Sequence, residues 1–144
     1  MIYQVDFEIN FEDEICYKSV KQHREYVNDE KAIWTISIVE EVDCFRRSID
    51  KLWIEEAGMC RWGLHVTGDS KRLEILGKNK HTDDLKIAKF VKDVISETWH
   101  GYPADYRQKR NDKPPENILL MWCDEGYIRK HHVSKIRSGK ACNL

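Results

Sequence analysis

The start of the chain decides its fold, because nine consecutive residues alternate between apolar and polar side chains: Tyr3-Gln4-Val5-Asp6-Phe7-Glu8-Ile9-Asn10-Phe11. The side chains of a β-strand point alternately to its two faces, so this period predicts a half-buried strand with its aromatic face inward. Residues 15–20 follow a turn-like acidic stretch and predict a second strand. Residues 32–39 are rich in β-branched side chains and predict a third, more central strand.

Further along the chain, the spacing of apolar residues changes to three or four. Residues 43–57, followed by Gly58, predict an amphipathic helix that ends at a glycine cap. Residues 83–99 predict a second helix, with Thr82 as its N-cap. Residues 61–67 and 72–77 predict a hairpin. Two more helices are expected, over residues 116–125 and from about 129 to 139.

These elements predict a single α+β domain over residues 1–144. Strands and helices come in runs and do not alternate as βαβ units, so we expect a mainly antiparallel sheet of about five strands. The helices over 43–57 and 83–99 are expected to pack on one face of this sheet. Within the domain, residues 1–106 form the predicted sheet-plus-helix core, and residues 107–144 form a basic loop and a helical tail.

The composition excludes several classes of protein. Of the 144 residues, 41% are hydrophobic and 34% are charged, which excludes intrinsic disorder. No window approaches 18 uncharged apolar residues, so neither a membrane span nor a membrane partner is expected. The opening residues lack the pattern of a secretory signal, and the five cysteines are an odd number without a Cys-x-x-Cys pair. We therefore expect reduced cysteines and a cytoplasmic protein.

Charge is distributed unevenly along the chain, although the net charge is only −1. Residues 1–60 carry 7 basic and 14 acidic side chains, whereas residues 107–144 carry 9 basic and 4 acidic ones. Such an asymmetry favours a site for an anionic partner. It is equally compatible with pairing of the two ends, within one chain or between two copies.

The densest cluster of functional side chains lies in residues 99–107, within a predicted loop that follows a helix. His100 is suited to exchange a proton near neutral pH, and Asp105 to orient it or to act alone. Arg107 is suited to hold a carboxylate or phosphate, with Trp99 and Tyr102 beside the ligand. The alternative is structural: Gly101 and Pro103 shape a tight connection, His100 satisfies a local carbonyl, and the tyrosines fill the core.

Two tripeptides share one pattern, His65-Val66-Thr67 and His132-Val133-Ser134. The pair resembles the signature of the 2H phosphoesterases. That resemblance implies metal-free hydrolysis of a phosphodiester, in which His65 and His132 exchange protons with the attacking and leaving oxygens. It also implies that Thr67 and Ser134 hold the phosphate.

The basic tail carries a further resemblance, in the stretch Ser134-Lys135-Ile136 with Gly139-Lys140. It resembles the recognition helix of repressor-type helix-turn-helix domains. This implies that Lys135, Arg137 and Lys140 contact phosphates or bases of DNA. We favour the alternative, a solvated basic helix that docks through Val133 and Ile136, because the tail has room for fewer helices than such a domain needs.

No metal or cofactor is expected. The sequence contains no zinc-ligand spacing, no glycine-rich phosphate loop and no nucleophile elbow, and the isolated His23 and His81 are interpreted as surface residues. The sequence therefore predicts an intracellular binding module whose basic C-terminal surface and 100–107 loop hold an anionic partner, either nucleic acid or an acidic protein. The alternative is a small metal-independent phosphodiesterase or related hydrolase that uses histidine acid–base catalysis.

Overall fold

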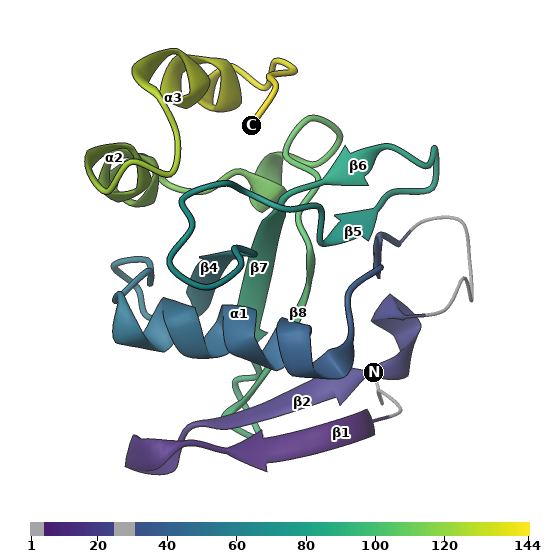
Figure 1. Cartoon of the computed structure of the whole chain (residues 1–144). Coiled ribbons are helices and arrows are strands. Elements are labelled where there is room, and N and C mark those ends of the chain that lie inside the picture. Colours follow the sequence, from purple (N-terminus) through teal and green to yellow (C-terminus); the bar gives the residue numbers. More distant parts are fainter. Residues whose placement is uncertain (1–4, 25–30) are drawn as a thin grey trace.

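The computed structural model of the chain describes residues 5–24 and 31–144 (Figure 1). Its main sheet has five strands in the order β1-β2-β8-β7-β4: β1 (Val5–Asn10), β2 (Cys16–Val20), β8 (Thr98–Pro103), β7 (Ile87–Lys92) and β4 (Cys60–Leu64). Every neighbouring pair is antiparallel except β2 and β8, which run parallel. A second, antiparallel sheet has the order β3 (Ile33–Trp34), β5 (Gly77–Lys78), β6 (Asp84–Leu85). The predicted α+β class and mainly antiparallel sheet are confirmed.

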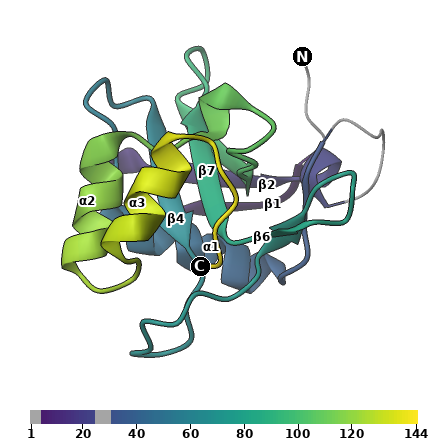
Figure 2. The same cartoon turned by 90° about the horizontal axis from the view of Figure 1, so that it is seen from above.

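Three α-helices complete the described part of the chain: α1 (Ile38–Asp50), α2 (Glu116–Asp124) and α3 (Lys130–Arg137). Three single 3₁₀ turns connect strands and helices: η1 (Glu12–Glu14), η2 (Lys21–His23) and η3 (Arg110–Asp112). The positions of α2 and α3 confirm the two predicted C-terminal helices, which lie side by side (Figures 1 and 2). Within residues 5–24 and 31–144, none of the helices combines the length and apolarity needed to cross a bilayer.

Helix α1 begins earlier than the sequence analysis predicts, and the predicted strand over 32–39 is limited to Ile33–Trp34. The cause is a capping box. The backbone N–H of Glu40 donates to Ser37 Oγ at 3.1 Å, and the backbone N–H of Ser37 donates to Glu40 Oε1 at 3.0 Å. Both bonds satisfy backbone donors at the helix start, so the β-branched residues that follow become helical. The helix ends at Asp50, well before residue 57.

Replacing Ser37 with Ala tests this cap. The variant removes the side-chain acceptor for the Glu40 N–H, so the free energy of unfolding should fall by about 1 kcal/mol. Urea denaturation of the wild type, Ser37→Ala and Ser37→Asp measures the effect. The Asp variant retains an acceptor and should stay close to the wild type, whereas equal losses in both variants would show that the cap contributes nothing.

The predicted helix over 83–99 is wrong, because this segment forms β6, β7, a turn and β8. The apolar spacing that suggested a helix includes Ile95, which is 96% exposed in the turn. There the carboxylate of Asp93 accepts hydrogen bonds from the backbone N–H groups of Ile95 and Ser96, both at 2.9 Å, and fixes the reversal. The predicted hairpin of 61–67 with 72–77 is also wrong, since β4 pairs with β7.

Two apolar cores hold these layers together. One lies between α1 and the main sheet and includes Tyr17, Phe45 and Phe90, and the other joins α2 and α3 to β4 and β7 around Trp62 and Trp122. In β7, alternate residues therefore face different cores, with Ile87 in the second core and Ala88 and Phe90 in the first.

Gly101 in β8 is essential to the first of these cores. A Cβ at this position would lie 2.2 Å from Cδ1 of Phe90, so only glycine lets that ring close against the strand. The Trp34 indole N–H donates to the carbonyl oxygen of Gly101 at 3.2 Å. Because side chains alternate along a strand, the neighbours of Gly101, His100 and Tyr102, point to the face of the sheet away from α1.

Candidate functional site

A pocket of about 360 Å³ lies at the carboxyl end of β8. Its lining includes three histidines and three lysines, and we name it the histidine–lysine pocket after them: His23, His81, His100, Lys31, Lys80 and Lys109. These side chains come from four separate segments: the end of η2, the start of β3, the β5–β6 turn, and β8 with the residues that follow it. The fold therefore assembles this basic lining from parts that are distant in the sequence.

The rings of His23, His100 and Tyr102 stack at the base of this pocket. His23 lies 5.2 Å from Tyr102 between ring centroids, at an interplanar angle of 30°, and 6.1 Å from His100 at 7°. His23 is only 7% exposed, so its interpretation as a surface residue is wrong. The parallel pairing of β2 with β8 explains this placement, because it brings the segment after β2 beside the end of β8.

The electrostatic environment of the two stacked histidines is positive. Burial, together with the nearby charge of Lys31 and the proximity of the His100 ring, lowers the pKa of His23 to about 3. Burial also lowers the pKa of His100, Asp93 opposes this shift, and Lys31 reinforces it. Both imidazoles are therefore neutral at pH 7, and the ammonium of Lys31 acts on both of them. An anion placed here would be stabilised by the same charge that disfavours protonation of the rings.

The acidic side chains of this pocket, Asp105 and Asp112, accept hydrogen bonds that stabilise its wall. Asp112 accepts hydrogen bonds from the Tyr102 hydroxyl at 3.0 Å and from the backbone N–H of Asp105 at 2.9 Å. The Asn79 amide donates to Asp105 Oδ2 at 3.0 Å. Asn79, Asp105 and Asp112 are all buried. This network fixes the loop after β8, and with it the position of the lysine at residue 109.

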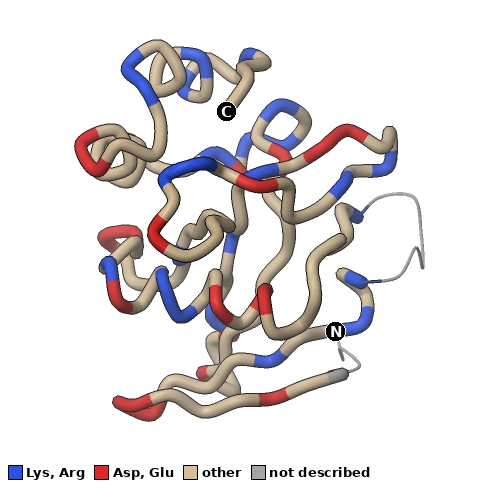
Figure 3. Tube along the Cα trace, in the orientation of Figure 1, with Lys and Arg blue, Asp and Glu red and all other residues tan. Residues whose placement is uncertain are grey.

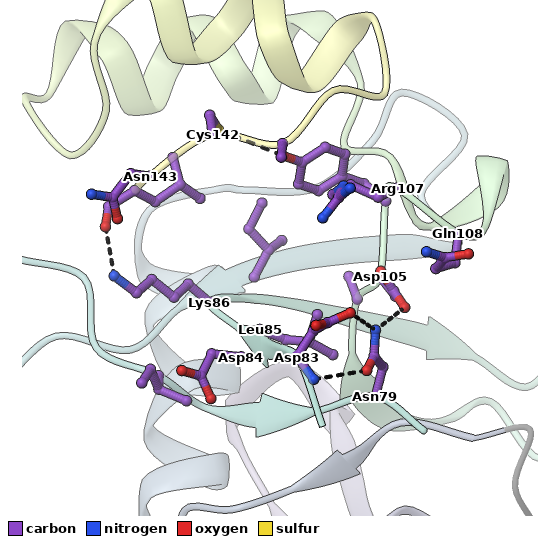
Figure 4. Close-up of a pocket in the computed structure, with 16 residues that line it drawn as sticks. Asn79, Asp83, Asp84, Leu85, Lys86, Asp105, Arg107, Gln108, Cys142 and Asn143 are labelled. Atoms are coloured by element: carbon purple, nitrogen blue, oxygen red, sulfur yellow. Dashed lines mark hydrogen bonds between the residues drawn. The ribbon is translucent and has the colours of Figure 1, made fainter. Parts of the chain in front are cut away.

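A second pocket, of about 270 Å³, shares Asn79 and Asp105 with the first (Figure 4). We name it the aspartate pocket, because Asp83, Asp84 and Asp105 line it, together with Lys86 and Arg107. The Asn79 side-chain amide donates to Asp83 at 3.1 Å as well as to Asp105 (Figure 4). Residues 141–144 form another part of its lining, where Lys86 Nζ donates to the carbonyl oxygen of Leu144 at 2.6 Å.

A third, more open groove lies between residues 71–75 and the start of α3 and has a volume of about 730 Å³. We name it the arginine groove; it shares Ile75 and Lys86 with the aspartate pocket. Its lining contains four cationic side chains, one carboxylate and two histidines: Lys71, Arg72, Lys86, Arg129, Glu74, His131 and His132. Five of the chain's six histidines therefore line either this groove or the histidine–lysine pocket.

The charge asymmetry of the sequence is visible in space. Lys and Arg are frequent around α3, the loop after β8 and the β5–β6 turn, whereas acidic residues form the β1–β2 connection (Figure 3).

The two tripeptides of the phosphoesterase resemblance have different neighbours. His65 Nε2 lies 3.1 Å from Glu40 Oε2 at the start of α1, and His65 lines none of the three hollows. His132 lines the arginine groove, and its Nδ1 accepts from the backbone N–H of Arg129 at 3.0 Å. Thr67 and Ser134 are exposed. Because α3 is helical, the side chains of residues 132 and 134 diverge by roughly 200°.

The remaining predicted residues fall into two groups. Tyr102 and Arg107 line the hollows, whereas Trp99 is 4% exposed in the core against α1. Lys135, Arg137 and Lys140 lie outside the linings of all three hollows. Arg137 pairs with Glu116 at 3.1 Å. Val133 and Ile136 are buried, so the prediction that the tail docks through them is confirmed.

No family model, no curated protein and no solved structure matches this chain. Among the residues that the structure describes, no three side chains of the metal-ligating types gather in a metal-binding arrangement. The site therefore has to be interpreted from its own geometry. His23, Lys31 and Lys80 were missed in the sequence because each comes from a different segment and none forms a local motif.

Proposed function

We propose that this protein is a binding module for an anionic ligand that carries phosphate, and that the histidine–lysine pocket holds the phosphate. The observation that carries this proposal is the concentration of Lys31, Lys80 and Lys109 around one pocket. Lysine ammonium groups are strong point-charge ligands for phosphate, and the neutral rings of His23 and His100 add hydrogen-bonding nitrogens.

The carboxylates of the pocket support the same proposal. Asp105 and Asp112 lie in the wall, but their hydrogen bonds to Asn79, Tyr102 and the backbone use them as structural acceptors. Three lysines therefore line this wall together with two carboxylates that already accept hydrogen bonds. The five cysteines are free, and their odd number supports placing this binding module in a reducing cytoplasm.

Titration with inorganic phosphate tests the proposal. Phosphate should shift the C2–H proton resonances of His23 and His100, because a bound anion changes the environment of both imidazoles and favours their protonated forms. The double variant Lys31→Gln/Lys109→Gln should weaken phosphate binding about thirtyfold, since each lost charge removes on the order of 1 kcal/mol at close range. Isothermal titration calorimetry and NMR measure both effects.

The matched control is Arg46→Gln/Arg47→Gln, which removes the same charge from α1, away from the three hollows. It should bind phosphate like the wild type. If both double variants weaken binding equally, the effect is one of net charge and not of the pocket. If phosphate shifts no histidine resonance, the proposal is wrong, and dimerisation seen by sedimentation would then favour pairing of acidic and basic ends between copies.

A further inference from the structure

We infer that the phosphate-bearing ligand is a nucleic-acid strand, which extends from the histidine–lysine pocket to the arginine groove. This inference rests on the proposed function and adds a second contact surface to it. A small anion would fill only one pocket, whereas a polymer with regularly spaced phosphates would use two basic surfaces at once.

The arginine groove supplies the second basic surface. Lys71, Arg72 and Arg129 are exposed there, and Glu74 is the carboxylate that lines it with them. Within the described residues, no carboxylate lies within ion-pair distance of Arg72 or Arg129. Guanidinium groups hold phosphate oxygens with two parallel hydrogen bonds, so these two arginines are suited to a phosphodiester backbone.

The two basic surfaces are neighbours, because the aspartate pocket lies between them and shares lining residues with each. Arg107 and Lys86 line this middle pocket and continue the cationic side chains from one surface to the other. A strand bound at both surfaces must therefore pass over the aspartate pocket.

The chemistry of the middle pocket favours nucleic acid over an acidic peptide. The ionised side chains of an acidic segment offer no hydrogen-bond donor to the carboxylates of Asp84 and Asp105, which line this pocket. The exocyclic amino group of a nucleobase, in contrast, donates hydrogen bonds to carboxylates. Ile75, which is 40% exposed, adds apolar surface for a flat ring. The strand would thus place phosphates in the basic surfaces and a base in the pocket between them.

Binding of fluorescein-labelled single-stranded DNA 12-mers tests this inference by fluorescence anisotropy. The cytosine 12-mer should bind about tenfold more tightly than the thymine 12-mer, because thymine has no exocyclic amino group to donate to the aspartates. Affinity should fall with salt with a log–log slope near −0.7 for each phosphate neutralised. Arg72→Gln/Arg129→Gln should flatten that slope by about 1.4, and Arg46→Gln/Arg47→Gln should leave it unchanged.

Three results would overturn the inference. The first is phosphate binding by the wild type without binding of either 12-mer, in which case the proposed function stands and the strand does not. The second is an equal change of slope in the groove variant and the α1 control. The third is 12-mer binding that Lys31→Gln/Lys109→Gln does not weaken, because the strand must reach the histidine–lysine pocket. Equal affinity for the two 12-mers would overturn the placement of a base in the aspartate pocket.

Discussion

Arg24→Met should lower the free energy of unfolding by about 3–5 kcal/mol, because it leaves the carboxylate of Glu41 buried without its counter-charge. Glu41 on α1 is fully buried, and Arg24 Nη2 lies 2.7 Å from its Oε1. The hydroxyls of Tyr17 and Ser19 also donate to this carboxylate. The Arg24 guanidinium additionally donates to the carbonyl oxygen of Ile36 at 2.7 Å.

Burial raises the pKa of Glu41 even though the hydrogen bonds from Tyr17, Ser19 and Arg24 favour the charged form. The cost of burying this charge is therefore large, and the loss of Arg24 would leave it unbalanced. Urea denaturation of Arg24→Met, Glu41→Leu and the double variant measures the coupling. The double variant should recover part of the stability lost in Arg24→Met, since no unpaired charge remains. A loss below about 1 kcal/mol for Arg24→Met would show that the pair behaves like an exposed one.

Acidification from pH 6.5 to pH 5 should destabilise the protein through His23. The pKa of His23 is about 3 in the folded protein, far below the 6.5 of an ordinary histidine. Between these values the unfolded chain binds a proton that the folded protein does not, so stability rises with pH and falls as pH is lowered. The expected slope for this residue is about 1.4 kcal/mol per pH unit, or about 2 kcal/mol over the range.

The test compares the pH dependence of wild type and His23→Gln by urea denaturation at pH 7.5, 6.5, 5.5 and 5.0. His100 and His132 also have lowered pKa values, so the variant should retain part of the slope and lose the contribution of His23. Above pH 5 most carboxylates remain ionised, and the difference between the two proteins cancels their residual effect. Identical pH dependence in the two proteins would contradict the burial of a neutral His23.

Local signals predicted those parts of the fold in which sequence pattern and burial agree. The helices α2 and α3 end before Gly126 and Gly139, both at positive φ, and these glycines were visible as stop signals. The helix predicted over residues 83–99 was wrong because the positions of Leu85, Ala88 and Val91 are compatible with a helical spacing as well as with two strands. Ser37 and Glu40 have the spacing of a capping box in the sequence, but the β-branched residues around them favoured the prediction of a strand.

Only some of the residues of the candidate site could be predicted from the sequence. His100, Tyr102 and Arg107 are near one another along the chain, so a local cluster indicated them. The other half of the histidine–lysine pocket depends on tertiary contacts. His23 lies beside β8 because β2 pairs with that strand. Lys31 precedes β3, whose Trp34 donates to the Gly101 carbonyl oxygen of β8, and the lysine at residue 80 belongs to the turn of the second sheet. No property of these residues taken singly distinguishes them from solvated surface side chains.

The parallel pairing of β2 with β8 also determines when the site can form during folding. Its register joins Cys16 to Thr98, so 82 positions of chain must be closed into a loop before the pair exists. Contacts of such long sequence separation form slowly, because closing the loop lowers the entropy of the chain. This loss is compensated only when the rest of the sheet contributes its own contacts. A growing chain on the ribosome therefore has no histidine–lysine pocket until β8 has emerged, so the phosphate binding that we propose would be acquired late in synthesis.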